Sequence, residues 1–321
     1  MNLYRLTLRP LSAFGSEPLG DMLFGQLCWA ARNRYSEERL GELLTGYTAN
    51  RPFAVISDAL PAGHLPRPAL PGHWFETIDN EDRKAAKKRV WMPLELATAP
   101  VAEWVRHCKA PGDIAGAIPR EHSQPHNTIH RQTGTTGEGQ FAPYAMSQLW
   151  YGLDSVLEVY AGLDESRLSA GELEALFGDM GTFGFGRDAS IGLGKFQVLR
   201  IEPFAWPEPA STDAWLTLAP CAPQGLGFDA SRSFYRIFTR FGRHGDIGVH
   251  QGHPFKTPVL LAQTGAVFAP IPRAGAESTG GAFIGQGLGG GNTLSRAIPG
   301  TVHQGYAPVI GIQLPQREAA A

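Results

Sequence analysis

The chain has 321 residues, enough for two domains of ordinary size, and 43% hydrophobic and 18% charged residues, the balance of a folded globular protein. The formal net charge of −2 excludes a bulk polycation, so nucleic acid would have to bind through local basic patches. Glycine and proline contribute 39 and 25 residues without periodicity, which excludes collagen and favours a loop-rich α+β structure.

The cysteines and the apolar runs limit the class of protein further. Cys28, Cys108 and Cys221 form no CxxC pair, which argues against a disulfide framework and a cysteine zinc site. The N-terminal residues lack the pattern of a signal peptide, and no apolar run approaches membrane-spanning length. We therefore expect a cytoplasmic protein without membrane contact.

The first part of the chain predicts a strand, two helices and a second strand. Residues 3–10 alternate between apolar and polar side chains, which is typical of a half-buried strand. Residues 20–33 have helical spacing, with Asp21 as the expected N-cap. A shorter helix at 36–46 begins with a capping serine, and an apolar strand follows at 53–56.

Residues 73–125 have the character of an insertion, because an exposed charged stretch at 79–91 is followed by a run rich in glycine and proline. Order is expected to restart in a turn-rich segment at 128–144, before a strand at 155–163. The clearest helix signal lies at 168–181, where a serine and a glutamate are spaced as a capping box.

The second half predicts strands and another glycine-rich loop. The proline-rich segment 204–215 marks the expected boundary between domains 1–204 and 205–321. Beyond it, strands are predicted at 214–220, around 258–269 and at 307–314, and a glycine-rich loop at 279–292.

Residues 231–245 interleave arginines with aromatic side chains at amphipathic spacing. The arginines are Arg232, Arg236, Arg240 and Arg243. This composition is typical of an RNA-binding groove and also of a protein interface, and the sequence does not separate the two.

A glycine-rich run, "GTFGFGRDASIGLGKFQV" at 181–198, stands between the predicted helix and a strand at 195–204. The order is wrong for a dinucleotide-binding fingerprint, which needs a strand before the loop and a helix after it. A Walker loop is excluded because Phe196 follows Lys195 where a hydroxyl residue is required.

The run nevertheless has the composition of a nest for a polyanion backbone. Glycines and cations alternate in it, and the candidate contacts are Gly184, Gly186, Arg187, Ser190, Gly192, Gly194 and Lys195. The alternative is a sharp loop whose glycines only permit positive φ angles.

The run resembles the glycine-rich loop of the CRISPR RAMP superfamily, whose members bind guide RNA. Residues 20–30 and 52–71 are similar to the N-terminal signature of the type III-A (Csm) subunits that cap the 5′ tag of crRNA. Residues 127–141 resemble a strand-turn found across RAMP proteins, although His130 stands where aspartate is usual, and residues 303–314 resemble a closing strand.

The resemblance implies an α+β fold of two ferredoxin-like (RRM-like) domains, with the segment 73–125 as a thumb-like insertion. It implies a non-catalytic role in antiviral defence, without cofactor or metal. The expected partners are the 5′ tag of crRNA, a large polymerase-like subunit and the backbone RAMP subunit, with target RNA contacted indirectly.

Further RNA contacts are expected outside the glycine run. Arg131 is a phosphate candidate, His126 and His130 are stacking or hydrogen-bonding candidates, and Arg89 lies beside Trp91 in the insertion. Another RAMP branch processes crRNA with a histidine base. A metal-independent endoribonuclease that uses His126 or His303 is therefore the alternative function.

Overall fold

The computed structural model describes residues 1–76, 83–250, 252–271 and 282–315. Its first sheet is antiparallel and has the strand order β2-β8-β1-β9, with β3 paired to β8. The strands are β1 (Asn2–Pro10), β2 (Ala54–Ile56), β3 (Leu60–Pro61), β8 (Leu157–Leu163) and β9 (Phe196–Pro203).

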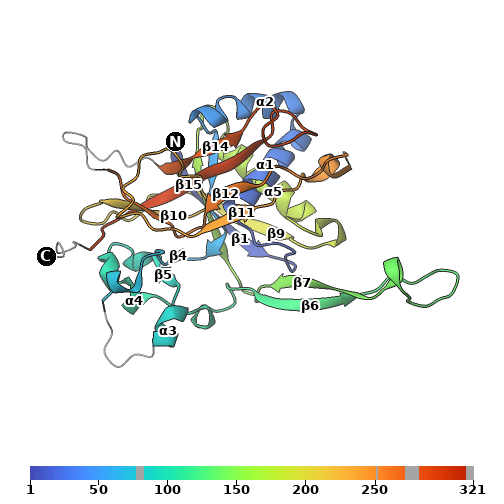
Figure 1. Cartoon of the computed structure of the whole chain (residues 1–321), viewed down its shortest axis with the longest axis horizontal. Coiled ribbons are helices and arrows are strands. Elements are labelled where there is room, and N and C mark those ends of the chain that lie inside the picture. The colour runs from blue at the N-terminus through green and yellow to red at the C-terminus, as the bar shows by residue number, and fades with distance from the viewer. Residues whose placement is uncertain (77–82, 251, 272–281, 316–321) are drawn as a thin grey trace.

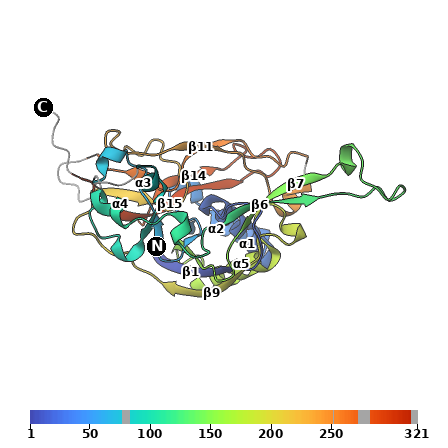
Figure 2. The same cartoon turned by 90° about the horizontal axis from the view of Figure 1, so that it is seen from below.

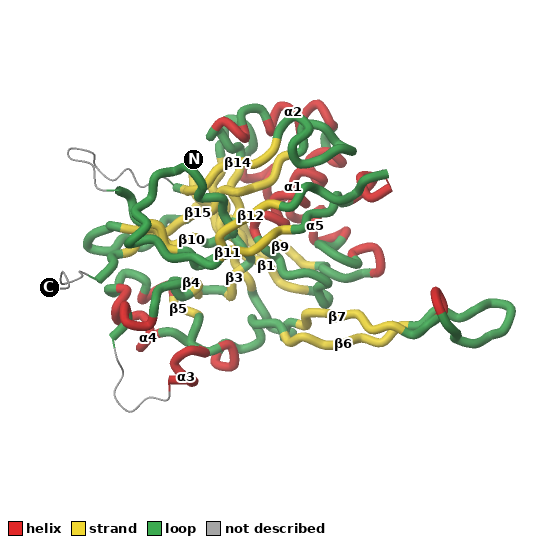
Figure 3. Tube along the Cα trace, viewed as in Figure 1, coloured by secondary structure: helices red, strands yellow, loops and turns green. Residues whose placement is uncertain are grey.

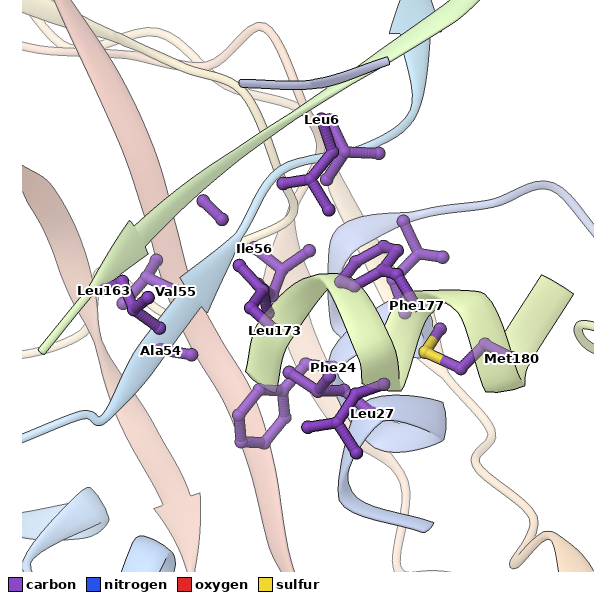
Figure 4. Packing of buried hydrophobic residues seen from close by; sticks show 14 of the residues in the cluster. Leu6, Phe24, Leu27, Ala54, Val55, Ile56, Leu163, Leu173, Phe177 and Met180 are labelled. Carbon is purple, nitrogen blue, oxygen red and sulfur yellow. The ribbon is translucent and has the colours of Figure 1, made fainter. Parts of the chain in front are cut away.

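Helices cover one face of this sheet. They are α1 (Gly20–Arg34), α2 (Glu37–Leu44) and α5 (Ala170–Phe183). Because α1 joins β1 to β2 and α5 joins β8 to β9, these elements have the β-α-β-β-α-β order of a ferredoxin-like unit. Figure 4 shows Leu173 and Phe177 of α5 packed among Leu6 and Ile56 of the sheet and Phe24 of α1, all of them buried.

The predicted start of α5 is confirmed. The Ser169 hydroxyl accepts a hydrogen bond from the Glu172 amide, and the Glu172 carboxylate accepts one from the Ser169 amide at 2.8 Å. The predicted cap of α1 is wrong, because the N-cap is Leu19 and the Asp21 side chain is buried in an ion pair.

The second half forms a four-stranded sheet of order β13-β10-β15-β14 and a two-stranded sheet, β11-β12. Their strands are β10 (Ala214–Thr217), β11 (Ile237–Arg240), β12 (Val259–Ala262), β13 (Val267–Phe268), β14 (Phe283–Gly289) and β15 (Val302–Ile312). The described residues beyond 204 contain a short 3-10 helix, η8 (Asp246–His250), and no α-helix. The α+β class is therefore confirmed, two ferredoxin-like domains are not confirmed, and the boundary at 204/205 stays a prediction.

The glycine-rich segment 279–292, predicted as a loop, forms strand β14 over Phe283–Gly289, while its first residues, 279–281, lie outside the described residues. A Cβ on Gly287 would approach the Tyr47 carbonyl oxygen to 2.5 Å, and one on Gly285 would approach the Gly305 carbonyl oxygen to 2.0 Å. The glycines are therefore needed for close backbone contact within a packed sheet.

The last strand, β15, packs against the first half of the chain. The Gln304 side chain accepts a hydrogen bond from the Ile56 amide and donates one to the Ile56 carbonyl, at 2.9 and 2.8 Å. Tyr306 is fully buried, and its hydroxyl donates to the Tyr47 carbonyl at 2.6 Å. The two halves therefore share one continuous interior.

The middle of the chain forms a small lobe and a projecting hairpin (Figures 1 and 2). The elements are β4 (His64–Pro66), α3 (Arg83–Lys88), β5 (Trp91–Pro93), α4 (Trp104–His107), β6 (Arg120–His126) and β7 (Tyr144–Trp150). Strands β6 and β7 pair along their whole length, and Figure 3 shows mostly loop at the tip between them.

The expected thumb-like insertion corresponds only in part to this hairpin. Most of segment 73–125 belongs to the lobe, where Trp104 is fully buried, and its last residues form β6. The turn-rich segment 128–144 supplies the hairpin tip. Residues 77–82, which include part of the charged stretch, lie outside the described residues.

Candidate RNA-binding site

The glycine-rich loop joins the end of α5 to the start of β9, as predicted. Gly184, Gly186, Gly192 and Gly194 all have positive φ angles, of 98°, 77°, 98° and 72°. A Cβ on Gly194 would lie 2.1 Å from the Phe185 carbonyl oxygen, whereas one on Gly192 would have no heavy atom within 4 Å. The fold thus requires glycine at position 194, because a side chain there would clash with the backbone. A side chain at position 192 would meet no neighbouring atom.

Gly194→Ala is expected to lower the free energy of unfolding by about 2 kcal/mol, because the new methyl group meets backbone at a positive φ. In Gly192→Ala the new methyl group meets no other atom, so only the unfavourable positive φ lowers the free energy of unfolding, by about 1 kcal/mol. Urea denaturation of both variants measures the difference. Equal losses would contradict the packing account of Gly194.

Three segments meet at this loop. The Gly194 amide donates to the Ala13 carbonyl at 2.7 Å, and the Lys195 amide donates to the Ser12 hydroxyl at 2.9 Å. Phe14 in turn exchanges backbone hydrogen bonds with Leu149 of β7, at 2.9 and 2.8 Å. The loop is therefore fixed beside the base of the projecting hairpin.

The Arg187 side chain spans from the loop to the hairpin. Its Nη2 donates to the Ser147 carbonyl at 2.6 Å, its Nε lies 3.1 Å from the Asp188 carboxylate, and the side chain is 53% exposed. Lys195 is exposed, and its Nζ donates a hydrogen bond to the Thr182 carbonyl, at 3.1 Å, near the C-terminal end of α5. Both cations thus remain accessible to solvent on one loop.

The loop also presents free backbone donors. Among the described residues, the amides of Asp188, Ala189 and Ser190 have no acceptor. These successive amides begin the 3-10 turn η7 (Ala189–Ile191), with Asp188 in the left-handed region at φ 65°. Consecutive free amides beside two cations give this loop the chemical character of an anion-binding nest, and its role as a binding site stays a prediction.

Exposed apolar side chains flank the nest, and the sequence analysis missed them. Phe183, the last residue of α5, is 74% exposed, and Ile191 in the loop is 61% exposed. On the hairpin, Trp150 near the base of β7 is about half exposed, and so is Tyr144, which lies at the opposite end of β7 and away from the nest. Phe183 follows buried Met180 by three residues and buried Leu176 by seven, so the helical spacing alone predicts burial, and no local signal would have shown its exposure.

The remaining predicted contacts lie on the hairpin or in the lobe. His126 at the end of β6 stacks on Tyr144, with ring centroids 5.5 Å apart, and His130 meets the ring of Phe141 edge-on at 4.6 Å. Arg131 is exposed at the hairpin tip. Arg89 follows α3, which lies apart from α5 and β9 in Figures 1 and 2.

The structure therefore brings together the seven predicted residues of the glycine loop, and no contact joins them to His126, His130, Arg131 or Arg89 within the described residues. The roles of all these residues stay predictions. His126, His130 and Arg131 lie toward the tip of the hairpin, whereas the glycine loop lies beside its base.

His303, the second candidate for a catalytic base, is only 8% exposed, and its Nε2 lies 3.2 Å from the Asp21 carboxylate. Arg240 donates to the same carboxylate from Nε and Nη2, at 2.7 and 2.9 Å. A general base for RNA cleavage must reach a 2′-hydroxyl, and this enclosed pairing gives no such access.

The arginines of segment 231–245 have different surroundings. Arg240 is partly buried and paired with the buried Asp21, and Arg232 is paired with Asp213. Arg243 lies over the ring of Phe255, and Arg236 is exposed. They form no continuous basic groove, because two of the four are neutralised by carboxylates.

Two further kinds of site are absent from the described residues. No cluster of three histidine, cysteine, aspartate or glutamate residues suited to a metal ion occurs there. Among the same residues, no helix combines the length and apolar character required to cross a membrane.

Comparison with known proteins gives matches by structure. Neither a family model nor a curated protein matches the sequence. A chain of the Csm1-Csm4 cassette in complex with AMPPNP superposes with a TM-score of 0.61 at 15% identity, over 99% of this chain and 100% of that one. The cassette in complex with pppApA gives 0.59 at 16% identity, with the same coverage.

A chain of the Csm3-Csm4 subcomplex of the type III-A CRISPR-Cas interference complex matches with a TM-score of 0.57 at 13% identity, over 94% and 99% of the two chains. Csm4 is the subunit common to these assemblies. The chain therefore has a Csm4-like fold. The resemblance to a type III-A (Csm) subunit, predicted from the sequence, is confirmed at the level of the fold.

Proposed function

We propose that the chain is a non-catalytic subunit of a type III-A CRISPR effector complex, which binds the 5′ tag of crRNA and joins the large polymerase-like subunit to the RAMP backbone. The full-length match to a fold found in both Csm1-Csm4 and Csm3-Csm4 assemblies supports the two protein partners. The boundary at residue 204/205, a ferredoxin-like unit in each half and a cytoplasmic location belong to the same proposal.

The glycine-loop nest carries the RNA-binding part of the proposal. Free amides, Arg187 and Lys195 supply donors and positive charge for phosphates, and Phe183 supplies an exposed ring for an unstacked base. A single-stranded tag needs both kinds of contact. If the phosphates of the RNA bind at this nest, the affinity for RNA should fall steeply as the salt concentration rises.

The double variant Arg187→Glu with Lys195→Glu is expected to weaken binding of an oligonucleotide matching the 5′ end of the native crRNA about 10- to 100-fold, because two cations on a polyanion site are reversed. The slope of log affinity against log salt should become shallower by about 1 to 2. Fluorescence anisotropy across a salt series measures both quantities.

The matched control is Arg51→Glu with Arg296→Glu, which reverses the same charge at two exposed positions away from the candidate RNA contacts. This control should bind RNA within about twofold of the unaltered protein. Unchanged affinity in the loop variant, with its circular dichroism spectrum intact, would show that the loop is only structural.

A further inference from the structure

A large cleft lies in the second half of the chain, away from the glycine loop. Its volume is about 1100 Å³, and its lining residues come from three parts of the chain, namely residues 67–71 with Val90, part of the segment 223–237 without Asp229, and residues 260–264 with Phe268. It opens beside strands β11 and β12, which lie in front of the four-stranded sheet in Figure 1.

The charge of this cleft has a single sign. Arg67 and Arg236 line it, and no aspartate or glutamate is among its described lining residues. Neither arginine has a carboxylate partner in the described part of the chain. Burial lowers the pKa of Arg67, and the nearby Arg236 lowers it further, so the two guanidinium groups repel each other in the absence of an anion.

The Arg67 side chain is held in place at the wall. Its Nη1 donates to the Ala86 carbonyl at 3.0 Å, and its guanidinium lies over the Phe75 ring at 5.5 Å. Arg236, by contrast, is exposed and has no hydrogen-bonded side-chain partner among the described residues. The cleft thus contains one arginine whose side chain is held in place, Arg67, and one whose side chain is free to adjust to a ligand, Arg236.

The same cleft exposes aliphatic surface. Ile237 is 63% exposed and Leu260 is 55% exposed, on the paired strands β11 and β12. Tyr235 is 44% exposed and already has one ring face stacked on Phe268. Aliphatic side chains offer no face for base stacking, whereas arginine beside aliphatic and tyrosine surface is what a protein interface uses.

We propose that this cleft is a docking site for a segment of a protein partner that carries carboxylates between apolar side chains. The two unpaired arginines select the acidic groups, and Ile237, Leu260 and Tyr235 contact the apolar ones. The inference rests on the proposed membership of a multi-subunit complex and not on the glycine-loop site.

Photo-crosslinking in the co-expressed complex identifies the occupant. Tyr235 is replaced by p-benzoylphenylalanine, the complex is purified and irradiated, and mass spectrometry maps the linked peptide. We expect a segment of a partner subunit that contains aspartate or glutamate. A link to RNA, to a segment without carboxylates, or to nothing would overturn the proposal. The same replacement at Leu153, which is 96% exposed elsewhere, is the control and should not link to that segment.

Charge reversal at the cleft provides a second measurement that does not depend on Arg67, whose substitution disturbs the wall. Arg236→Glu is expected to weaken association with the linked partner at least about tenfold, whereas Arg236→Lys and Arg296→Glu, at an exposed position that does not line the cleft, should stay within about threefold. Unchanged association of Arg236→Glu would overturn the proposal. Failure to recover any complex from the unaltered protein would instead overturn the proposed function.

Discussion

Asp21→Asn is expected to lower the free energy of unfolding by about 3–5 kcal/mol, because it leaves the Arg240 guanidinium without its buried counter-ion. Asp21 is 2% exposed and accepts two hydrogen bonds from Arg240. Burial alone would raise the pKa of Asp21, but His303 and Arg240 hold it below its usual range. The carboxylate is therefore charged at neutral pH.

Urea denaturation of the variant measures the loss, and Asp179→Asn is its control. Asp179 pairs with Arg34 at 2.7 Å, but both side chains are substantially exposed, so its removal should cost less than about 1 kcal/mol. The cycle of Asp21→Asn, Arg240→Met and the double variant isolates the coupling between the partners. A loss of less than about 1 kcal/mol for Asp21→Asn would show that the buried pair adds nothing to stability.

Asp58 is expected to make the protein less stable as the pH rises from 3.8 to about 7. Its carboxylate is buried and accepts hydrogen bonds from the Gly20 amide, at 2.7 Å, and from the Thr264 hydroxyl. Burial raises its pKa from 3.8 to about 7, the hydrogen bonds from Thr264 and Gly20 oppose the rise, and the nearby Asp21 charge adds to it.

The sign of this effect follows from proton uptake. Between the unfolded value of 3.8 and about 7, the folded state binds more protons at Asp58 than the unfolded state, so its contribution falls as pH rises and is lost above about 7. The slope approaches about 1.4 kcal/mol per pH unit within that interval. The pKa of Asp21 is lowered, so protonation of Asp21 affects stability only at acidic pH, below this interval.

The Asp58→Asn variant is the test, because an amide keeps an oxygen for the Gly20 amide and carries no charge. Relative to the unaltered protein, it should gain about 2 kcal/mol or more between pH 5 and pH 8, measured by urea denaturation at each pH. The comparison of the two proteins cancels the contribution of His244, whose pKa burial lowers. A constant difference across the pH range would refute the assigned titration.

Local signals predicted the elements that frame the glycine loop. The capping box at Ser169 and Glu172 and the apolar spacing of 168–181 depend on neighbours within one or two turns, so α5 was predicted nearly to its ends. The loop after α5 was predicted because glycine at such density disfavours continuation of a helix and permits the positive φ angles of a tight loop. The order helix, loop, strand could therefore be obtained from sequence alone.

Features that depend on distant segments could not be predicted in this way. Asp21 has the position of an N-cap in its own segment, yet its partner Arg240 is 219 residues away in the chain. Likewise, the glycines of β14 suggest a loop until Tyr47 and Gly305 are known to lie against them. Such close contacts between distant segments are determined by tertiary packing, so a local sequence pattern cannot predict them.

The position of β15 has a consequence for synthesis on the ribosome. Residues 302–312 are synthesised long after residues 47–56, yet Gln304 satisfies both backbone groups of Ile56 and Tyr306 fills the space beside Tyr47. Until then, the nascent first half exposes the free edge of β2 and an open apolar surface. The interior can therefore close only after β15 has been synthesised, and a product arrested or truncated before residue 302 is left as a target for chaperones and proteases.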